Sequence, residues 1–153
     1  MNPESLFVLF NNGVIPAWLL LLFAPRWRFT QLIVHAFWIP VLLGLGYLLA
    51  IVNGSGERAE GASFFSLPGV MLFFTNPWSA LAGWIHYLAF DLFVGAWEVR
   101  DAQRRNIPHL WVCVCLLFTL MLGPIGLALY AGLRLLRGTG FSLHEESGIP
   151  QST

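Results

Sequence analysis

The sequence predicts an all-α fold: a four-helix transmembrane bundle with a short interfacial or re-entrant segment between its second and third spans. Hydrophobic residues make up 57% of the 153 residues, charged residues only 10%, and the mean hydropathy is +0.69. Soluble domains carry about 25% charged residues. A crossing helix needs about 20 apolar residues, and four such segments occur, at about residues 5–23, 30–52, 77–97 and 108–133. We expect one transmembrane helical domain over residues 1–137 and no separate soluble domain.

Local sequence supports the boundaries of these spans. The first span has no positive residue before its apolar run and no small-x-small motif after it, so we expect it to be retained and not removed as a secretory signal. Pro77 and Pro108 stand at the first turns of the third and fourth spans, where a missing N–H costs nothing. Inside the fourth span, Pro124 removes a backbone hydrogen bond and predicts a kink, while Gly123 and Gly126 allow a neighbouring helix to approach.

Two other stretches are too polar or too short to cross a membrane. Residues 53–63, NGSGERAEGAS, form a polar linker, and the apolar segment SFFSLPGVMLFFT that follows is about half as long as a crossing. We expect this segment to lie along the interface or to dip in and return. Residues 138–153 are rich in Gly, Ser, Glu and Pro, which predicts a disordered tail.

Composition also excludes several classes of function. The formal net charge is zero and the basic residues are scattered, so we expect no nucleic-acid partner. Cys113 and Cys115 point about 200° apart on a helix, which favours simple packing over a disulfide or a shared metal. A metal needs three or four converging ligands, and the chain has no HxxxH or HExxH motif, so neither a metal site nor a cofactor is predicted.

Asp91 is the first candidate catalytic residue. It lies inside the third span, where an ionised Asp costs roughly 2.5–3.5 kcal/mol on insertion scales, so it should face the bundle interior and have a partner or a task. Burial in a low dielectric favours the protonated form of a carboxyl group, which is the form that a general acid needs.

His86 is the second candidate catalytic residue. It precedes Asp91 by five positions, so the two side chains diverge by about 140° around the helix and do not touch. Asp91 shares its face with Trp84 and Tyr87, whereas His86 shares another face with Phe90. A purely structural role for either residue stays open.

A pocket between the helices would have further lining residues. The chain has 13 Phe, seven Trp and three Tyr, which suit a flat conjugated or isoprenoid ligand and equally suit interfacial belts. The expected substrate-binding residues are Trp84, Tyr87, Phe90, Asn12, Pro124 and Tyr130.

Several segments together resemble the abscisic-acid-deficient-four-like family of small four-span membrane proteins. They are WIHYLAFDLFVGAW at 84–97, RDA at 100–102, IPHL at 107–110, CLLFTLMLGPIGLALY at 115–130 and NNGVIPAWLLLLFAP at 11–25. The resemblance covers most of the chain up to Tyr130. Plant members of that family are required for making neoxanthin from violaxanthin, an isomerisation that opens a 5,6-epoxide and leaves an allene beside a new hydroxyl group.

The resemblance implies a membrane isomerase acting on a carotenoid or other isoprenoid lipid. Asp91 would then protonate the epoxide oxygen and His86 would remove a proton from the neighbouring carbon, from two sides of a ligand groove. The expected partners are a lipophilic small molecule and membrane lipids, with a homo-oligomer or a larger membrane complex left open. Because no plastid-type transit segment precedes the first span, we expect a multi-pass protein of a bacterial inner membrane.

Two other functions stay open at this point. The first is a non-catalytic protein that binds a pigment or lipid or helps to assemble a membrane complex. The second is a transporter or proton path, which is less favoured because inverted repeats are absent from the sequence.

Overall fold

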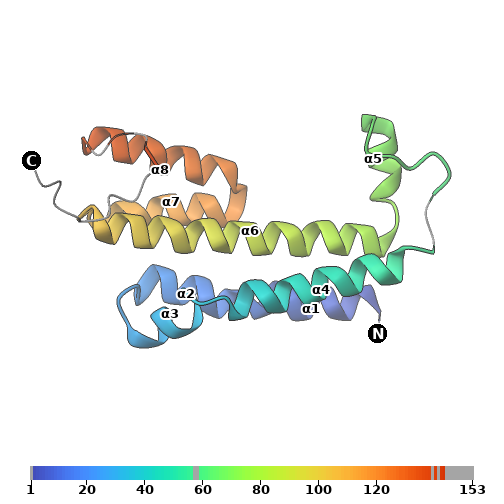
Figure 1. Ribbon diagram of the computed structural model, residues 1–153, viewed down its shortest axis with the longest axis horizontal. Coiled ribbons are helices and arrows are strands. Elements are labelled where there is room, and N and C mark those ends of the chain that lie inside the picture. The colour runs from blue at the N-terminus through green and yellow to red at the C-terminus, as the bar shows by residue number, and fades with distance from the viewer. Residues whose placement is uncertain (1, 57–58, 139, 141, 144–153) are drawn as a thin grey trace, which may run out of the picture.

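A computed structural model describes residues 2–56, 59–138, 140 and 142–143, and within these ranges it has eight helical segments and no strand (Figure 1). The prediction of an all-α fold is confirmed. The segments are α1 (Pro3–Gly13), α2 (Ile15–Phe23), α3 (Arg28–Ile33), α4 (Trp38–Gly54), α5 (Leu67–Phe73), α6 (Pro77–Arg104), α7 (His109–Leu122) and α8 (Pro124–Leu136). Nearly all of the predicted tail, 138–153, lies outside the described residues, so its disorder stays a prediction.

Helix α6 is the longest element, and α1, α2, α4, α7 and α8 pack along it (Figure 1). It begins at Pro77, and the side chain of Asn76 caps it by accepting hydrogen bonds from the backbone N–H groups of Trp78 and Ser79, at 2.8 and 3.2 Å. Its 28 residues span about 42 Å, which exceeds a hydrocarbon core of about 30 Å. Both ends of α6 can therefore reach the interfaces of a bilayer.

Helices α1, α2 and α4 cover one side of α6 (Figure 1). The break between α1 and α2 is slight, because Val14 keeps a right-handed helical conformation, and together they form a 21-residue apolar segment. Trp18 of α2 is buried against Gly95 of α6, where an added Cβ would come within 2.8 Å of the indole ring. Gly95 is thus required for the close approach of Trp18.

The predicted fourth span, 108–133, is not one kinked helix but a hairpin (Figure 1). Gly123 adopts a φ of +46°, which favours glycine, and Pro124 starts a new helix that returns along α7. At Gly126 an added Cβ would lie 2.1 Å from the Thr119 backbone nitrogen, so only glycine allows this close packing of α7 and α8. The residues that predicted a kink instead produce a reversal, because a glycine with positive φ precedes the proline.

The lengths of the helices fit this arrangement. Among the described residues, two segments are long and apolar enough to cross a membrane, Pro3–Phe23 and Pro77–Arg104, and α4 is a shorter apolar helix of 17 residues. Helices α7 and α8 have 14 and 13 residues, or about 21 and 20 Å each, which is less than a crossing. In Figure 1, α5 lies across the direction of α6 at the end where α6 begins, as expected for a segment along an interface.

The hairpin also places the end of α8 at the opposite end of the molecule from the start of α1 (Figure 1). It returns the chain to the end where α2 joins α3 and α6 joins α7, and contacts link these parts: Gln103 donates to the Pro25 carbonyl at 3.2 Å, and Arg134 lies 3.5 Å from Asp101. We call this end the arginine end. It holds seven of the eight basic residues of the sequence, namely Arg26, Arg28, Arg100, Arg104, Arg105, Arg134 and Arg137.

Candidate functional site

Asp91 lies midway along α6 and faces the tip of the α7–α8 hairpin. A Cβ at Gly123 would come within 2.8 Å of its Oδ1, so the carboxyl group abuts the tip directly. The first turn of α8, the electropositive end of a helix, starts at the next residue. Asp91 Oδ2 is buried and has no hydrogen-bond partner among the described residues. A buried polar atom of this kind requires an explanation, and a bound ligand is one.

A groove of about 470 Å³ runs between α1, α2, α6 and α7, and its α7 lining residues, Leu120 and Met121, lie just before this tip. We call it the Trp84 groove. Its rim is ordered by two hydrogen bonds: Trp84 Nε1 donates to Asn11 Oδ1 at 3.1 Å, and the Tyr87 hydroxyl donates to the Leu120 carbonyl at 3.0 Å. It is lined by Asn11, Val14, Ile15, Trp18, Leu19, Leu22, Trp84, Tyr87, Leu88, Leu120 and Met121.

Tyr87 connects the groove with Asp91. The two residues are one turn apart on α6 and close enough for the phenol to interact with the carboxyl group. The last two groove residues, Leu120 and Met121, precede Gly123 by only two or three positions. Tyr87 is therefore the lining residue of the Trp84 groove that lies next to the Asp91 carboxyl group.

Glu98, two turns beyond Asp91 on α6, is completely buried beneath the hairpin. The Thr119 hydroxyl oxygen lies 3.0 and 3.2 Å from its two carboxyl oxygens and also 3.0 Å from the Cys115 carbonyl oxygen. Cys115 precedes Thr119 by four residues, so this last contact is the usual bond of a helical threonine to its own backbone.

Asp101 forms a second buried polar cluster that joins α6 to α8. It accepts a hydrogen bond from the Tyr130 hydroxyl at 2.8 Å, bonds Arg105 Nε at 2.9 Å, and lies 3.5 Å from Arg134 Nε. Asp101, Tyr130 and Arg134 are all less than 5% exposed. This cluster fixes the returning end of the hairpin to α6.

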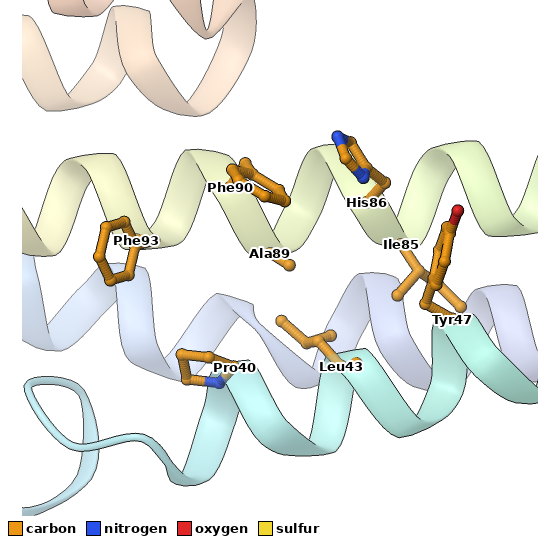
Figure 2. Close-up of a pocket in the computed structure, with 9 residues that line it drawn as sticks. Pro40, Leu43, Tyr47, Ile85, His86, Ala89, Phe90 and Phe93 are labelled. Carbon is orange, nitrogen blue, oxygen red and sulfur yellow. The ribbon is translucent and has the colours of Figure 1, made fainter.

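A different groove, of about 450 Å³, lies on the α4 side of α6 and contains His86 (Figure 2). We call it the His86 groove. The His86 ring stacks on Phe90 with centroids 4.5 Å apart and faces Tyr47 of α4 at 6.1 Å. The remaining lining is aliphatic or aromatic: Pro40, Leu43, Gly44, Ile85, Ala89 and Phe93.

Near the arginine end, a smaller hollow of about 220 Å³ contains His35 and Arg100. Arg100 Nη1 lies 3.1 Å from His35 Nδ1, and because a guanidinium only donates, Nδ1 accepts and the ring proton is on Nε2. Burial, with a contribution from the Arg100 guanidinium, lowers the pKa of His35 to about 4, so the ring is neutral at pH 7. His35 Nε2 is buried and has no partner among the described residues.

The structure separates the two predicted catalytic residues. Asp91 faces the α7–α8 tip and lines neither groove, while His86 is exposed along the His86 groove, so the two residues do not share either groove. Their divergence around the helix agrees with the spacing in the sequence. Their catalytic roles stay predictions.

The predicted substrate-binding residues fall into three groups. Trp84 and Tyr87 line the Trp84 groove, and Phe90 lines the His86 groove. Asn12 is exposed and its neighbour Asn11 occupies the groove instead, because Asn11 lies on the side of α1 that faces α6. Pro124 is at the hairpin tip, and Tyr130 is buried in the Asp101 cluster and lines neither groove.

Sequence reasoning missed the buried polar residues beneath the hairpin. Asp101 lies among arginines near the end of α6 and is not among the predicted site residues, yet the return of α8 covers it with Tyr130 and Arg134. One pattern pointed to the site: Glu98 shares its face of α6 with Asp91 and Gly95. In the part of the chain that the structure describes, no group of three or more His, Cys, Asp or Glu could hold a metal ion.

Comparison with known proteins identifies relatives of the chain. Residues 5–130 match the ABA DEFICIENT 4-like family. The chain is 26% identical over 131 residues to "Protein ABA DEFICIENT 4, chloroplastic" of Arabidopsis thaliana, a match that covers 81% of this chain and 58% of that protein. The chain thus spans just over half the length of this relative. No solved structure matches the chain.

Proposed function

Because the chain belongs to the ABA DEFICIENT 4-like family, which is related to neoxanthin synthesis, we propose that it is a multi-pass membrane protein that isomerises a carotenoid or another isoprenoid lipid. The observation that carries this proposal is the position of Asp91: a carboxyl group with a buried, unpartnered oxygen at the hairpin tip, one helical turn from Tyr87 of the largely apolar Trp84 groove. The sequence resemblance to the family had led to the same expectation.

The surface of the molecule supports the membrane location. Large apolar side chains are exposed on the outer faces of α1, α4 and α7, for example Leu9 at 59%, Leu42 at 62% and Leu110 at 75%. Exposed apolar surface of this extent is unfavourable in water and matches hydrocarbon. The predicted bacterial inner membrane gains no support from the comparison, since the relative is named as a chloroplast protein.

The chemistry needs one proton delivered and one removed, with no net oxidation. We assign the delivery to Asp91: its carboxyl proton goes to the epoxide oxygen, and the carbon–oxygen bond breaks to leave a hydroxyl group and a cation delocalised along the polyene. The resulting carboxylate then takes a proton from the carbon beside the cation and forms the allene. Tyr87 orients the Asp91 carboxyl group, and the apolar groove excludes water that would trap the cation.

With Asp91 as both acid and base, His86 is not needed for the reaction unless the substrate lies in the His86 groove. Express the protein in a carotenoid-producing host that contains violaxanthin and quantify the pigments by chromatography. Asp91→Asn should lower product formation by about 100-fold or more, the usual contribution of a positioned acid, whereas Glu60→Gln, an exposed carboxylate between α4 and α5, should not. If His86→Gln abolishes product and Asp91→Asn does not, the site is the His86 groove and the assignment to Asp91 is wrong.

A second candidate function is the binding of a pigment or lipid without chemistry. The separation of Asp91 from His86 favours it, and so does the largely apolar lining of both grooves. Purification in mild detergent would then recover an unaltered pigment in a constant ratio to protein. Trp84→Ala should lower that ratio, because it removes an indole from the groove and its bond to Asn11. A ratio unchanged in Trp84→Ala would exclude the Trp84 groove as the binding site.

A further inference from the structure

The His86 groove and the hollow at His35 are adjacent. Both are lined by Pro40 of α4 and Phe93 of α6, so together they follow the α4–α6 contact from Tyr47 and His86 to His35 and Arg100. Figure 2 shows the first part of this path, with Phe93, Phe90 and His86 in a row along α6. We call the whole path the α4–α6 groove. Between its two polar ends the lining is apolar.

The end at His35 and Arg100 offers hydrogen-bond donors to an anion. Arg100 carries a permanent positive charge, and the proton on His35 Nε2 is buried beside it without a partner among the described residues. A phosphate oxygen in the hollow would supply the acceptor that His35 lacks and would pair with the charge of Arg100.

The length of the groove fits one lipid chain. From Arg100 to His86 is 14 residues along α6, or about 21 Å. One leaflet contributes about 15 Å to a hydrocarbon core of about 30 Å. With Arg100 at the head-group level, an acyl chain in the groove would extend past Phe93 and end close to Phe90 and His86.

We propose that the α4–α6 groove binds one anionic membrane lipid, with its phosphate at Arg100 and His35 and an acyl chain along Phe93 and Phe90. The proposal rests on the membrane location given above and not on the isomerase chemistry, which uses the other side of α6. The ligand is a phospholipid of the leaflet at the arginine end, where basic residues already gather.

Native mass spectrometry of the purified full chain with added phosphatidylglycerol or phosphatidylcholine tests this. We expect the wild type to retain one phosphatidylglycerol in preference to phosphatidylcholine. Arg100→Gln should lower that retention at least fivefold, while Arg104→Gln, an exposed arginine one turn away, should not. Equal retention of the two lipids by the wild type, or equal losses in the two variants, would overturn the proposal.

A second pair of variants tests the groove without touching the charge. A Cβ at Gly44 meets nothing within 4 Å, so Gly44→Leu should fill the groove without disturbing the backbone and should displace the lipid. Gly132→Leu, in equally open space on α8, is the matched control and should retain it. Retention of phosphatidylglycerol by Gly44→Leu would contradict occupation of the groove.

Two further measurements identify the source of the ligand. Inorganic phosphate should not displace the lipid, and displacement would point to a free anion site instead. A dimer that persists in Gly132→Leu and dissociates in Gly44→Leu would show that a second copy of the chain covers the groove, and this too would refute the proposal. Pigment analysis of the same variants tests the isomerase proposal separately from the lipid site. A protein that forms no isomerised pigment but still selects phosphatidylglycerol contradicts only the isomerase proposal.

Discussion

At the scale of single residues, the environment of Glu98 fixes where its proton is. The Thr119 hydroxyl has one hydrogen, yet its oxygen lies 3.0 Å from both the Cys115 carbonyl oxygen and a Glu98 carboxyl oxygen. One arrangement that satisfies all three groups has Thr119 donate to Cys115 and Glu98 donate its own proton to Thr119. The position of Glu98, fully buried without a cation, favours the same neutral form.

We therefore expect Glu98 to be protonated at neutral pH. Infrared difference spectroscopy should show a carboxylic-acid carbonyl band that disappears in Glu98→Gln, and this variant should unfold at nearly the wild-type temperature because glutamine can also donate to Thr119. Glu4→Gln, an exposed residue of α1, is the control and should keep the band. A carboxylate band assigned to Glu98 at pH 7 would contradict this reading of the hydrogen bonds.

Asp101 differs from Glu98 because it lies beside arginine side chains, Arg105 at 2.9 Å and Arg134 at 3.5 Å. In Asp101→Asn the buried Arg134 loses its carboxylate, and breaking a buried pair from one side typically costs about 3–5 kcal/mol. Thermal unfolding in detergent should show this loss, and Arg104→Gln should show almost none. Replacing both partners, in Asp101→Leu with Arg134→Met, should recover much of the stability because no lone charge then remains buried.

At the scale of elements, the hairpin depends on glycine at two positions with different causes. Gly123 supplies a positive φ for the reversal, and Gly126 supplies space against Thr119. Asp91, Glu98 and Asp101 lie beneath α7 and α8 only because of this reversal. The candidate site is thus a property of the hairpin packed on α6.

Gly126→Ala tests the packing of the hairpin. Its methyl group would overlap the Thr119 backbone, so α8 has to move, and we expect a loss of about 3 kcal/mol, the upper range for overpacking. Gly132→Ala on the same helix has open space and should stabilise the protein by up to about 1 kcal/mol, the difference in helix propensity. Unfolding in urea and detergent measures both. Equal effects of the two variants would show that the two helices do not pack through Gly126.

At the scale of the whole molecule, the hairpin decides the topology. Four crossings would leave both termini on one side, with five arginines facing three. Three crossings and a hairpin gather seven arginines at one end and leave only Arg58, which is outside the described residues, in the connection between α4 and α5. For the membrane protein that we propose, the positive-inside rule predicts that the arginine end lies on the cytoplasmic side or its equivalent.

We predict that the two termini lie on opposite sides of the membrane. Single cysteines at Ser55 and at Arg137, in a background with Cys113 and Cys115 replaced by alanine, should react with an impermeant thiol reagent from opposite sides of sealed vesicles. Ser55 precedes α5 and Arg137 follows α8. Reaction of both from the same side would restore a fourth crossing and remove the re-entrant hairpin.

The sequence by itself determined the all-helical class, the apolar outer surface and the starts of α6 and α7 near Pro77 and Pro108, because these follow from local composition and backbone chemistry. It also determined that Asp91 and His86 lie on different sides of one helix, since helical geometry fixes that angle. The tertiary structure alone decided that residues 108–133 reverse at Gly123, that Asp101 is buried, and that Asn11 and not Asn12 faces the groove. The physical reason is that glycine followed by proline is compatible with either a kink or a turn, and only the packing of α8 on Thr119 and Asp101 selects the turn.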